Sequence, residues 1–152
     1  MATIKIVNGQ TEASFDGIAT NSLAVSNGDL LALASGFVAK ATASTGRLIG
    51  CANGTKTYAS DNQTVAKDVV NFLKFVPGET IIELTTTASI AAADVGKFFN
   101  LTGSQTVDHS TGRTFQTSVN TSDAGAAADA ATIYPLQLVE YISATKGRFM
   151  VV

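Results

Sequence analysis

The sequence is short of charged side chains, tryptophan and cysteine, and each shortage excludes a class of protein. Only 14% of its 152 residues are charged, and the net charge is −2; an average domain has about 25% charged residues. Nucleic-acid binding needs a basic surface, so we expect no nucleic-acid partner. A single cysteine cannot build a disulfide framework. The 45% hydrophobic content argues against a disordered chain.

Long hydrophobic runs are also missing. No stretch reaches the roughly 18 apolar residues that a membrane-spanning helix needs. The first nine residues lack the order of a signal peptide, because Lys5 lies inside the short apolar run rather than before it. We therefore expect synthesis in a cytoplasm and no membrane partner.

What is present is a series of short apolar runs separated by turn residues. Asn-Gly pairs at 8–9, 27–28 and 53–54 suit the tight turns of antiparallel hairpins. The first pair predicts a hairpin of residues 4–7 and 11–15, and the last predicts one that Tyr58 closes. Such spacing favours a mainly β fold of antiparallel sandwich- or barrel-like lobes, with one or two short helices.

Further elements are expected along the rest of the chain. Ser89 can cap and Gly96 can end a short helix over residues 89–96. Residues 65–76 have helical periodicity but strand-forming residue types, so both interpretations stay open. Residues 1–152 are expected to form one domain, with lobes at 1–60 and 64–152 as an alternative. Strands are expected at residues 29–33, 37–41, 47–52, 79–87, 97–101, 114–119, 133–142 and 148–152.

Two reactive side chains invite a catalytic interpretation. His109 is the only histidine, and Asp108 and Ser110 flank it. A catalytic triad needs three groups that converge in space, which neighbours in a polar loop rarely do, so we expect a solvated loop. Cys51 lies in an apolar run and is expected to be a buried, inert thiol.

Carboxylates give no stronger signal. Glu79 and Glu83, four residues apart on a predicted strand, would lie about 13 Å apart, too far for the usual glycosidase pair. Four residues with oxygen-bearing side chains could loosely suggest a calcium-binding loop: Asn120, Ser122, Asp123 and Asp129. Their spacing is not that of such a loop. We therefore expect no catalytic residue, metal or cofactor, and a protein that is not an enzyme.

The shortage of charge is itself informative. Charged residues normally keep monomers soluble and protect open sheet edges, and lysine and glutamate are depleted at interface centres. A surface of Thr, Ser, Asn and Gly therefore indicates a protein that assembles with other chains. The alternative is a neutral β-domain whose sheet edges are closed within the monomer.

Parts of the chain resemble the head decoration (cement) proteins of tailed bacteriophages. They are Phe75-Val76-Pro77-Gly78, Glu83-Leu84, residues 91–101 and the closing residues 138–152, while residues 28–50 are similar to the small β lobe of such proteins. The resemblance implies a β-rich homotrimer on the outer capsid surface of the virion. There it would bind the major capsid protein and stabilise the shell. The resemblance also favours a strand at residues 65–76.

The N-terminal residues 1–15 are our candidate contact with the shell or with a neighbouring copy. They include the apolar side chains of Ile4, Ile6, Val7 and Phe15. An ordinary first hairpin is the alternative. Other functions that remain open are a head-fibre base, a tail-tube or minor coat component, and a carbohydrate-binding β-sandwich. The last usually uses exposed Trp or Tyr, and the chain has no Trp.

Overall fold

The computed structural model describes residues 5–8, 11–12, 17–43, 47–113, 117–118 and 132–152. As predicted, the fold is mainly β, with antiparallel pairing between the named strands. Two short helical segments accompany the strands: the π-turn η1 (Asn62–Ala66) and the 3-10 turn η2 (Ala92–Asp94). Within the described part of the chain, no helix is long and apolar enough to cross a bilayer.

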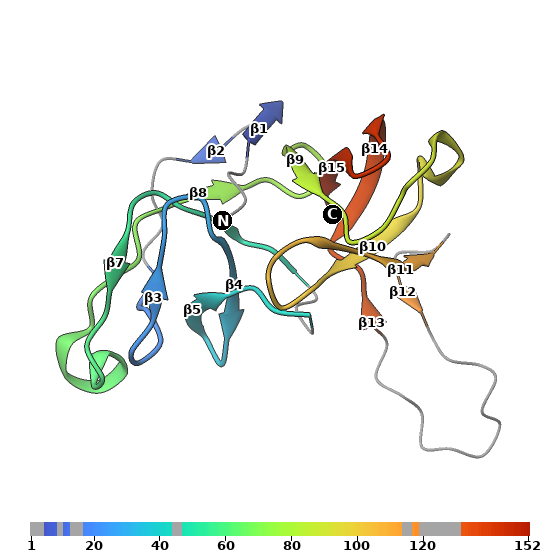
Figure 1. The fold of residues 1–152 in the computed structure, drawn as a ribbon. Helices are drawn as coiled ribbons and strands as arrows, with labels where there is room; N and C mark the ends of the chain where they lie inside the picture. The colour runs from blue at the N-terminus through green and yellow to red at the C-terminus, as the bar shows by residue number, and fades with distance from the viewer. Residues whose placement is uncertain (1–4, 9–10, 13–16, 44–46, 114–116, 119–131) are drawn as a thin grey trace, which may run out of the picture.

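The strands are β1 (Lys5–Asn8), β2 (Thr11–Glu12), β3 (Ala24–Val25), β4 (Leu30–Ala34), β5 (Phe37–Lys40), β6 (Gly50–Ala52), β7 (Lys56–Thr57), β8 (Phe72–Phe75), β9 (Ile81–Thr85), β10 (Phe98–Leu101), β11 (Val107–Arg113), β12 (Thr117–Ser118), β13 (Thr132–Ile133), β14 (Leu136–Ser143) and β15 (Lys146–Val151). Figure 1 shows that they gather into two neighbouring groups, blue to green and yellow to red.

The first group is a sheet that closes on itself. Five strands pair in the order β2-β8-β6-β4-β5. Ala19 bridges Val38 of β5, and Ile18 bridges Val69 just before β8, so the residues before β3 join the two sides of the sheet. We call this unit the N-terminal barrel. Its interior also receives side chains from the paired strands β3 and β7, and consists of Ala19, Leu23, Val25, Leu31, Val38, Ala52, Tyr58, Val70 and Phe72.

The second group closes in the same way. Six strands pair in the order β1-β9-β15-β14-β10-β11. Thr86, directly after β9, bridges Val107 of β11, and the Thr87 amide donates to the Val107 carbonyl at 2.9 Å. The strands from β9 to β11 therefore curl into a second small barrel, the C-terminal barrel, with β1 added along β9.

One hydrophobic core joins the two barrels. The cluster that fills the C-terminal barrel also contains residues of the N-terminal barrel, namely Leu30, Ala32, Ala41, Leu48, Cys51 and Phe75. Strand β4 is therefore buried on both faces: Leu30 faces the C-terminal barrel and Leu31 faces the interior of its own. This explains why the Leu30-Leu31-Ala32 run is apolar at every position instead of alternating with polar residues.

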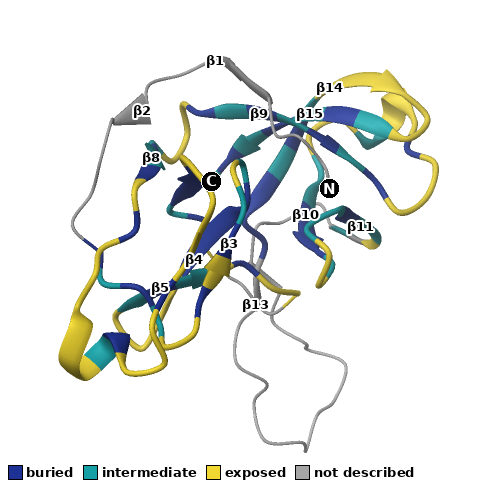
Figure 2. Ribbon diagram, turned by 60° about the vertical axis from the view of Figure 1, so that its left-hand side comes forward, coloured by how far each residue is buried: buried dark blue, intermediate teal, exposed yellow. Residues whose placement is uncertain are grey.

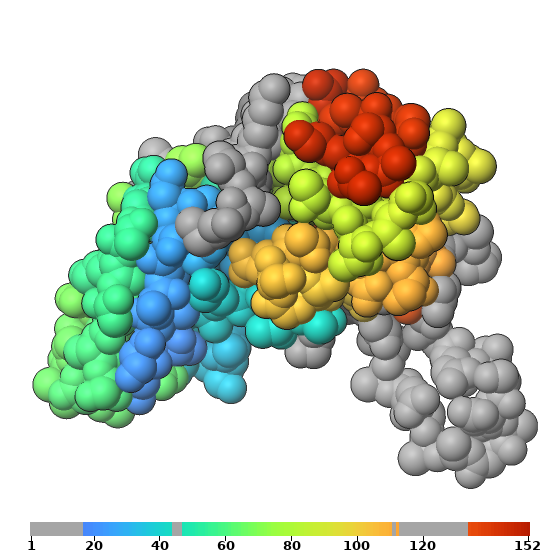
Figure 3. Space-filling model, in the orientation of Figure 1, coloured from blue at the N-terminus to red at the C-terminus, as the bar shows by residue number. Residues whose placement is uncertain are grey.

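A single side chain adds polar contacts to this junction. Gln105, in the turn between β10 and β11, has a left-handed backbone with φ of 63°. Its Oε1 accepts a hydrogen bond from the Leu30 amide at 2.8 Å. Its Nε2 donates to the carbonyls of Leu30 at 2.8 Å and Ala41 at 3.2 Å. Figure 3 shows this turn, in orange, against the N-terminal barrel.

Several hairpin predictions are corrected by the strand pairing. The Ser35-Gly36 turn does join β4 to β5, and both residues have the positive φ of a tight hairpin turn. However, β1 pairs with β9 and β2 pairs with β8, so they form no hairpin with each other. The reason is that β8 and β9 follow one another across the Pro77-Gly78 turn, so the partners of β1 and β2 are neighbours along the chain. Similarly, β7 pairs with β3 rather than with β6.

The expected strand over residues 65–76 is confirmed only for β8. Before it, the chain forms η1, and Lys67 is left-handed with φ of 53°. The buried Asn62 side chain fixes this turn, because Nδ2 donates to the Ala19 and Asp68 carbonyls and Oδ1 accepts from the Asp68 amide, at 2.9 to 3.0 Å. Between β8 and β9 the chain passes from the five-stranded to the six-stranded sheet, at Pro77-Gly78.

Other boundaries differ more modestly. The expected helix at residues 89–96 is reduced to η2, and Asp94 rather than Ser89 caps it by accepting the Ala91 amide at 2.9 Å. Strand β11 was not expected at all. The expected strand at 114–119 is described only as β12, and the division into one domain or two lobes stays a prediction.

Removing the Gln105 side chain should weaken the junction between the barrels. We expect Gln105→Ala to lower the free energy of unfolding by about 2 kcal/mol, because the amide of the buried Leu30 loses its bond to Gln105 Oε1. Urea unfolding measures this. Gln137→Ala is the matched control, since Gln137 makes an exposed bond to the Gly96 carbonyl. Equal effects for both variants would contradict the assigned role of Gln105.

Gly50 on β6 lies directly against the backbone of β8. A Cβ atom there would overlap the Leu73 carbonyl oxygen and lie 2.5 Å from Phe72 Cδ2. We expect Gly50→Ala to destabilise the protein by about 3 kcal/mol in thermal or urea unfolding, because the backbone must shift. Gly103→Ala, where nothing lies within 4 Å, should stay within about 0.5 kcal/mol of the wild type.

Candidate functional site

His109 does not form a triad with its sequence neighbours. The solvated-loop prediction is wrong, because residues 107–113 form β11, where alternate side chains point to opposite faces. Asp108 Oδ1 accepts hydrogen bonds from Ser110, from the amide at 3.0 Å and from Oγ at 2.6 Å. His109 instead lies 3.6 Å from Asp94, between Nε2 and Oδ2, and stacks on Phe99.

Asp94 is the centre of this small polar cluster. Lys97 Nζ lies 2.7 Å from Oδ1, and the Ala91 amide donates to Oδ2 at 2.9 Å. The Lys97 ammonium first, and then the Ala91 amide, lower the pKa of the Asp94 carboxyl. A carboxylate held ionised in this way is a weak base, so its geometry suits fastening η2 against β11 better than proton transfer.

Cys51 is buried in the core between the barrels, as predicted. Burial raises the pKa of its thiol, which keeps the sulfur protonated and unreactive. The chain's single imidazole, His109, could activate a thiol as a base, but it lies against Asp94 at the surface.

Glu79 and Glu83 lie in different surroundings and do not form a carboxylate pair on one strand. Glu79 is exposed in the turn before β9, whereas Glu83 on β9 forms ion pairs with Lys146 at 3.3 Å and Arg148 at 4.0 Å. Arg148 in turn contacts Glu140 at 2.6 Å. Such surface pairs contribute little stability.

The candidate metal ligands of the sequence are the four residues between 120 and 129. This group lies outside the described residues. Among the residues that are described, no three His, Cys, Asp or Glu side chains are grouped to hold a metal ion.

Two of the four predicted N-terminal contact residues lie on a strand at the edge of a sheet. Ile6 and Val7 belong to β1, and Ile6 pairs opposite Ile82, whereas Ile4 and Phe15 lie outside the described residues. Strand β1 ends the six-stranded sheet and β2 ends the five-stranded sheet, so residues 5–8 and 11–12 supply an outer strand to each. We call these residues the N-terminal strap.

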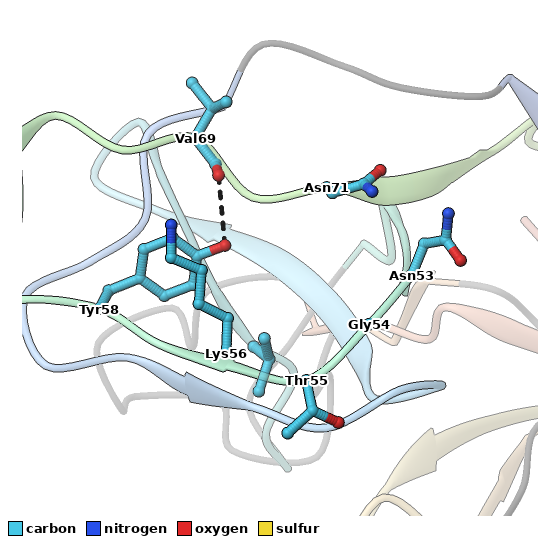
Figure 4. A pocket seen from close by; sticks show the side chains of 8 residues that line it. Asn53, Gly54, Thr55, Lys56, Tyr58, Val69 and Asn71 are labelled. Atoms are coloured by element: carbon cyan, nitrogen blue, oxygen red, sulfur yellow. Dashed lines mark hydrogen bonds between the residues drawn. The ribbon is translucent and has the colours of Figure 1, made fainter.

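Sequence reasoning missed a pocket on the N-terminal barrel. The Asn53 amide still donates to the Asn71 carbonyl at 2.9 Å, but beyond this bond the two chain segments separate. The gap is a pocket of about 260 Å³. Val25, Tyr58 and Val69 line it, and the Tyr58 hydroxyl donates to the Val69 carbonyl at 3.2 Å (Figure 4).

The other lining residues are polar or small: Asn53, Gly54, Thr55, Lys56 and Asn71. Lys56 Nζ lies 4.8 Å from the centre of the Tyr58 ring and 3.3 Å from Asp68 Oδ2. Asn27 holds the 53–55 turn, because its Oδ1 accepts the Gly54 amide at 2.9 Å and its own amide donates to Thr55 Oγ1 at 3.2 Å. The Asn-Gly pairs at 27–28 and 53–54 predict turns, but they do not predict that the two turns meet beside one pocket.

No family model, curated protein or solved structure matches this chain. Within the described part of the chain, two features bear on function: the N-terminal strap and the pocket.

The lowered pKa of Asp94 predicts a pH-dependent contribution to stability. We expect Asp94→Asn to lower the free energy of unfolding by about 1 kcal/mol at pH 7. This contribution is complete above the usual aspartate pKa of about 3.9 and is lost as the pH falls through the lowered folded value. Urea unfolding across this range measures it. The control is Asp61→Asn, at a position without a side-chain cap bond, which should stay within about 0.5 kcal/mol of the wild type at pH 7.

Proposed function

We propose that the protein is a non-enzymatic structural component of a bacteriophage particle. In this proposal it binds the outer surface of the head as a homotrimer, contacts the major capsid protein and stabilises the shell. Another structural role in the same particle, such as a head-fibre base or a tail-tube or minor coat component, is the nearest alternative.

The placement of the N-terminal strap carries this proposal. Strands β1 and β2 form the outer edges of the two sheets, and the paired positions are few: Lys5, Ile6 and Asn8 with β9, and Thr11 and Glu12 with β8. An edge strand recognises a neighbouring chain by adding main-chain hydrogen bonds. A segment held by few paired positions also opens at low free-energy cost. The strap can therefore extend a sheet of the shell or of a neighbouring copy.

Two further features support an assembly role. The charge content of 14% is low for a protein that remains alone in solution. In addition, the closing stretch that resembles decoration proteins forms the β14–β15 hairpin. The far end of this hairpin is exposed (Figure 2). It includes two apolar residues, Tyr141 and Ile142, each 39% exposed.

Stabilisation follows from mass action. A ligand that binds only the assembled shell lowers the free energy of that state by RT ln(1 + [L]/Kd). Three linked subunits that each contact coat protein would multiply the effect, because the second and third contacts form at high effective concentration. No reactive group is needed for this function.

Binding to empty heads tests the proposal. We expect the purified chain to sediment with empty heads of the phage that encodes it and to raise their disruption temperature. Deleting residues 1–15 should weaken binding about tenfold or more, because the strap is lost. Ile6→Pro, which removes one strand amide, should act in the same direction.

The control is Val65→Ser, at a side chain that is 71% exposed on η1 and away from the strap. It should bind like the wild type, and circular dichroism should confirm that all variants remain folded. A chain that does not sediment with heads at any concentration would contradict the proposed function. Unchanged binding by both strap variants would contradict the strap as the contact.

A further inference from the structure

We propose that the pocket on the N-terminal barrel binds one uncharged sugar unit, such as the terminal residue of a glycan. This goes beyond the structural role, because the pocket lies on the barrel around β7 whereas the strap follows β8 and β9. A particle carrying such a site could attach to a glycan-coated surface.

Charge at the pocket favours a neutral ligand. Lys56 is the only charged lining residue, and its ammonium already lies 3.3 Å from the Asp68 carboxylate. Tyr58 stays a neutral phenol, since burial raises the pKa of its hydroxyl. An anion would compete with Asp68 for Lys56, and a cation would meet its repulsion.

The lining also matches the two-sided chemistry of a pyranose. Val69, which is 47% exposed, offers most of the apolar surface to C–H groups, and the edges of the buried Val25 and Tyr58 side chains complete this wall. Asn53 and Asn71 carry amides, each of which can donate and accept, as vicinal hydroxyls require. Figure 4 shows these two amides across the gap from Tyr58.

Size and rigidity agree with a single small ring. The volume of about 260 Å³ is slightly below the roughly 300–1,000 Å³ of sites for drug-sized ligands. Both walls are fixed before binding: Asn27 holds the 53–55 turn, and the Tyr58 hydroxyl is bonded to Val69. Such preorganisation lowers the entropy cost of binding.

Titration followed by amide NMR tests the site. We expect methyl α-glucopyranoside or N-acetylglucosamine, at up to tens of millimolar, to shift the resonances of residues 53–58 and 69–71. The Asn53→Ala/Asn71→Ala double variant should bind about tenfold or more weakly, because hydrogen bonds to the ligand are lost. Val69→Phe should have the same effect by filling the pocket, and Val69 is exposed enough to accept it.

Thr57→Ala is the matched control, since Thr57 is exposed on β7 but does not line the pocket. It should bind like the wild type, and thermal unfolding should verify that every variant is folded. No shifts with either sugar would overturn the proposal, as would shifts that persist in both pocket variants. Larger shifts at these residues with inorganic phosphate than with sugar would also overturn it, because the site would then be an anion site. None of these outcomes bears on binding to heads.

Discussion

The core shared by the two barrels is the interaction on which the rest of the structure depends. A lobe of about 60 residues buries only roughly 60% of its extended surface and is marginally stable alone. Here β4 supplies side chains to both hydrophobic clusters, so neither barrel has a complete core without it. Gln105 adds hydrogen bonds across the same junction, which ties the position of the barrels to the pairing of β4.

Barrel closure changes how the shortage of charge should be interpreted. The bridges at Val38, Val69 and Val107 protect sheet edges within the monomer, so a neutral surface does not by itself require a partner. Edge addition is therefore best argued for the strap, where β1 and β2 form the outermost strands. The proposed assembly rests on this local feature more than on the composition of the whole chain.

The sequence indicated the fold class, the β4–β5 hairpin and the burial of Cys51, because turn residues and apolar runs are local signals. It missed β11, since its Asp-His-Ser-Thr-Gly composition is that of a loop and only pairing with β10 makes it a strand. It also misassigned the partners of β1, β2 and β7, because partner choice depends on contacts between distant residues. The pocket was missed for the same reason: residues 25, 53–56, 58, 69 and 71 meet only in the fold.

The copy number of the chain in purified particles tests the central claim most directly. Quantitative gel analysis or mass spectrometry of intact particles gives its ratio to the coat protein. A cement protein predicts a copy number comparable with that of the coat protein, because it occupies repeated sites over the whole shell. Absence from the particle, or the few copies typical of a connector or fibre base, would contradict the account.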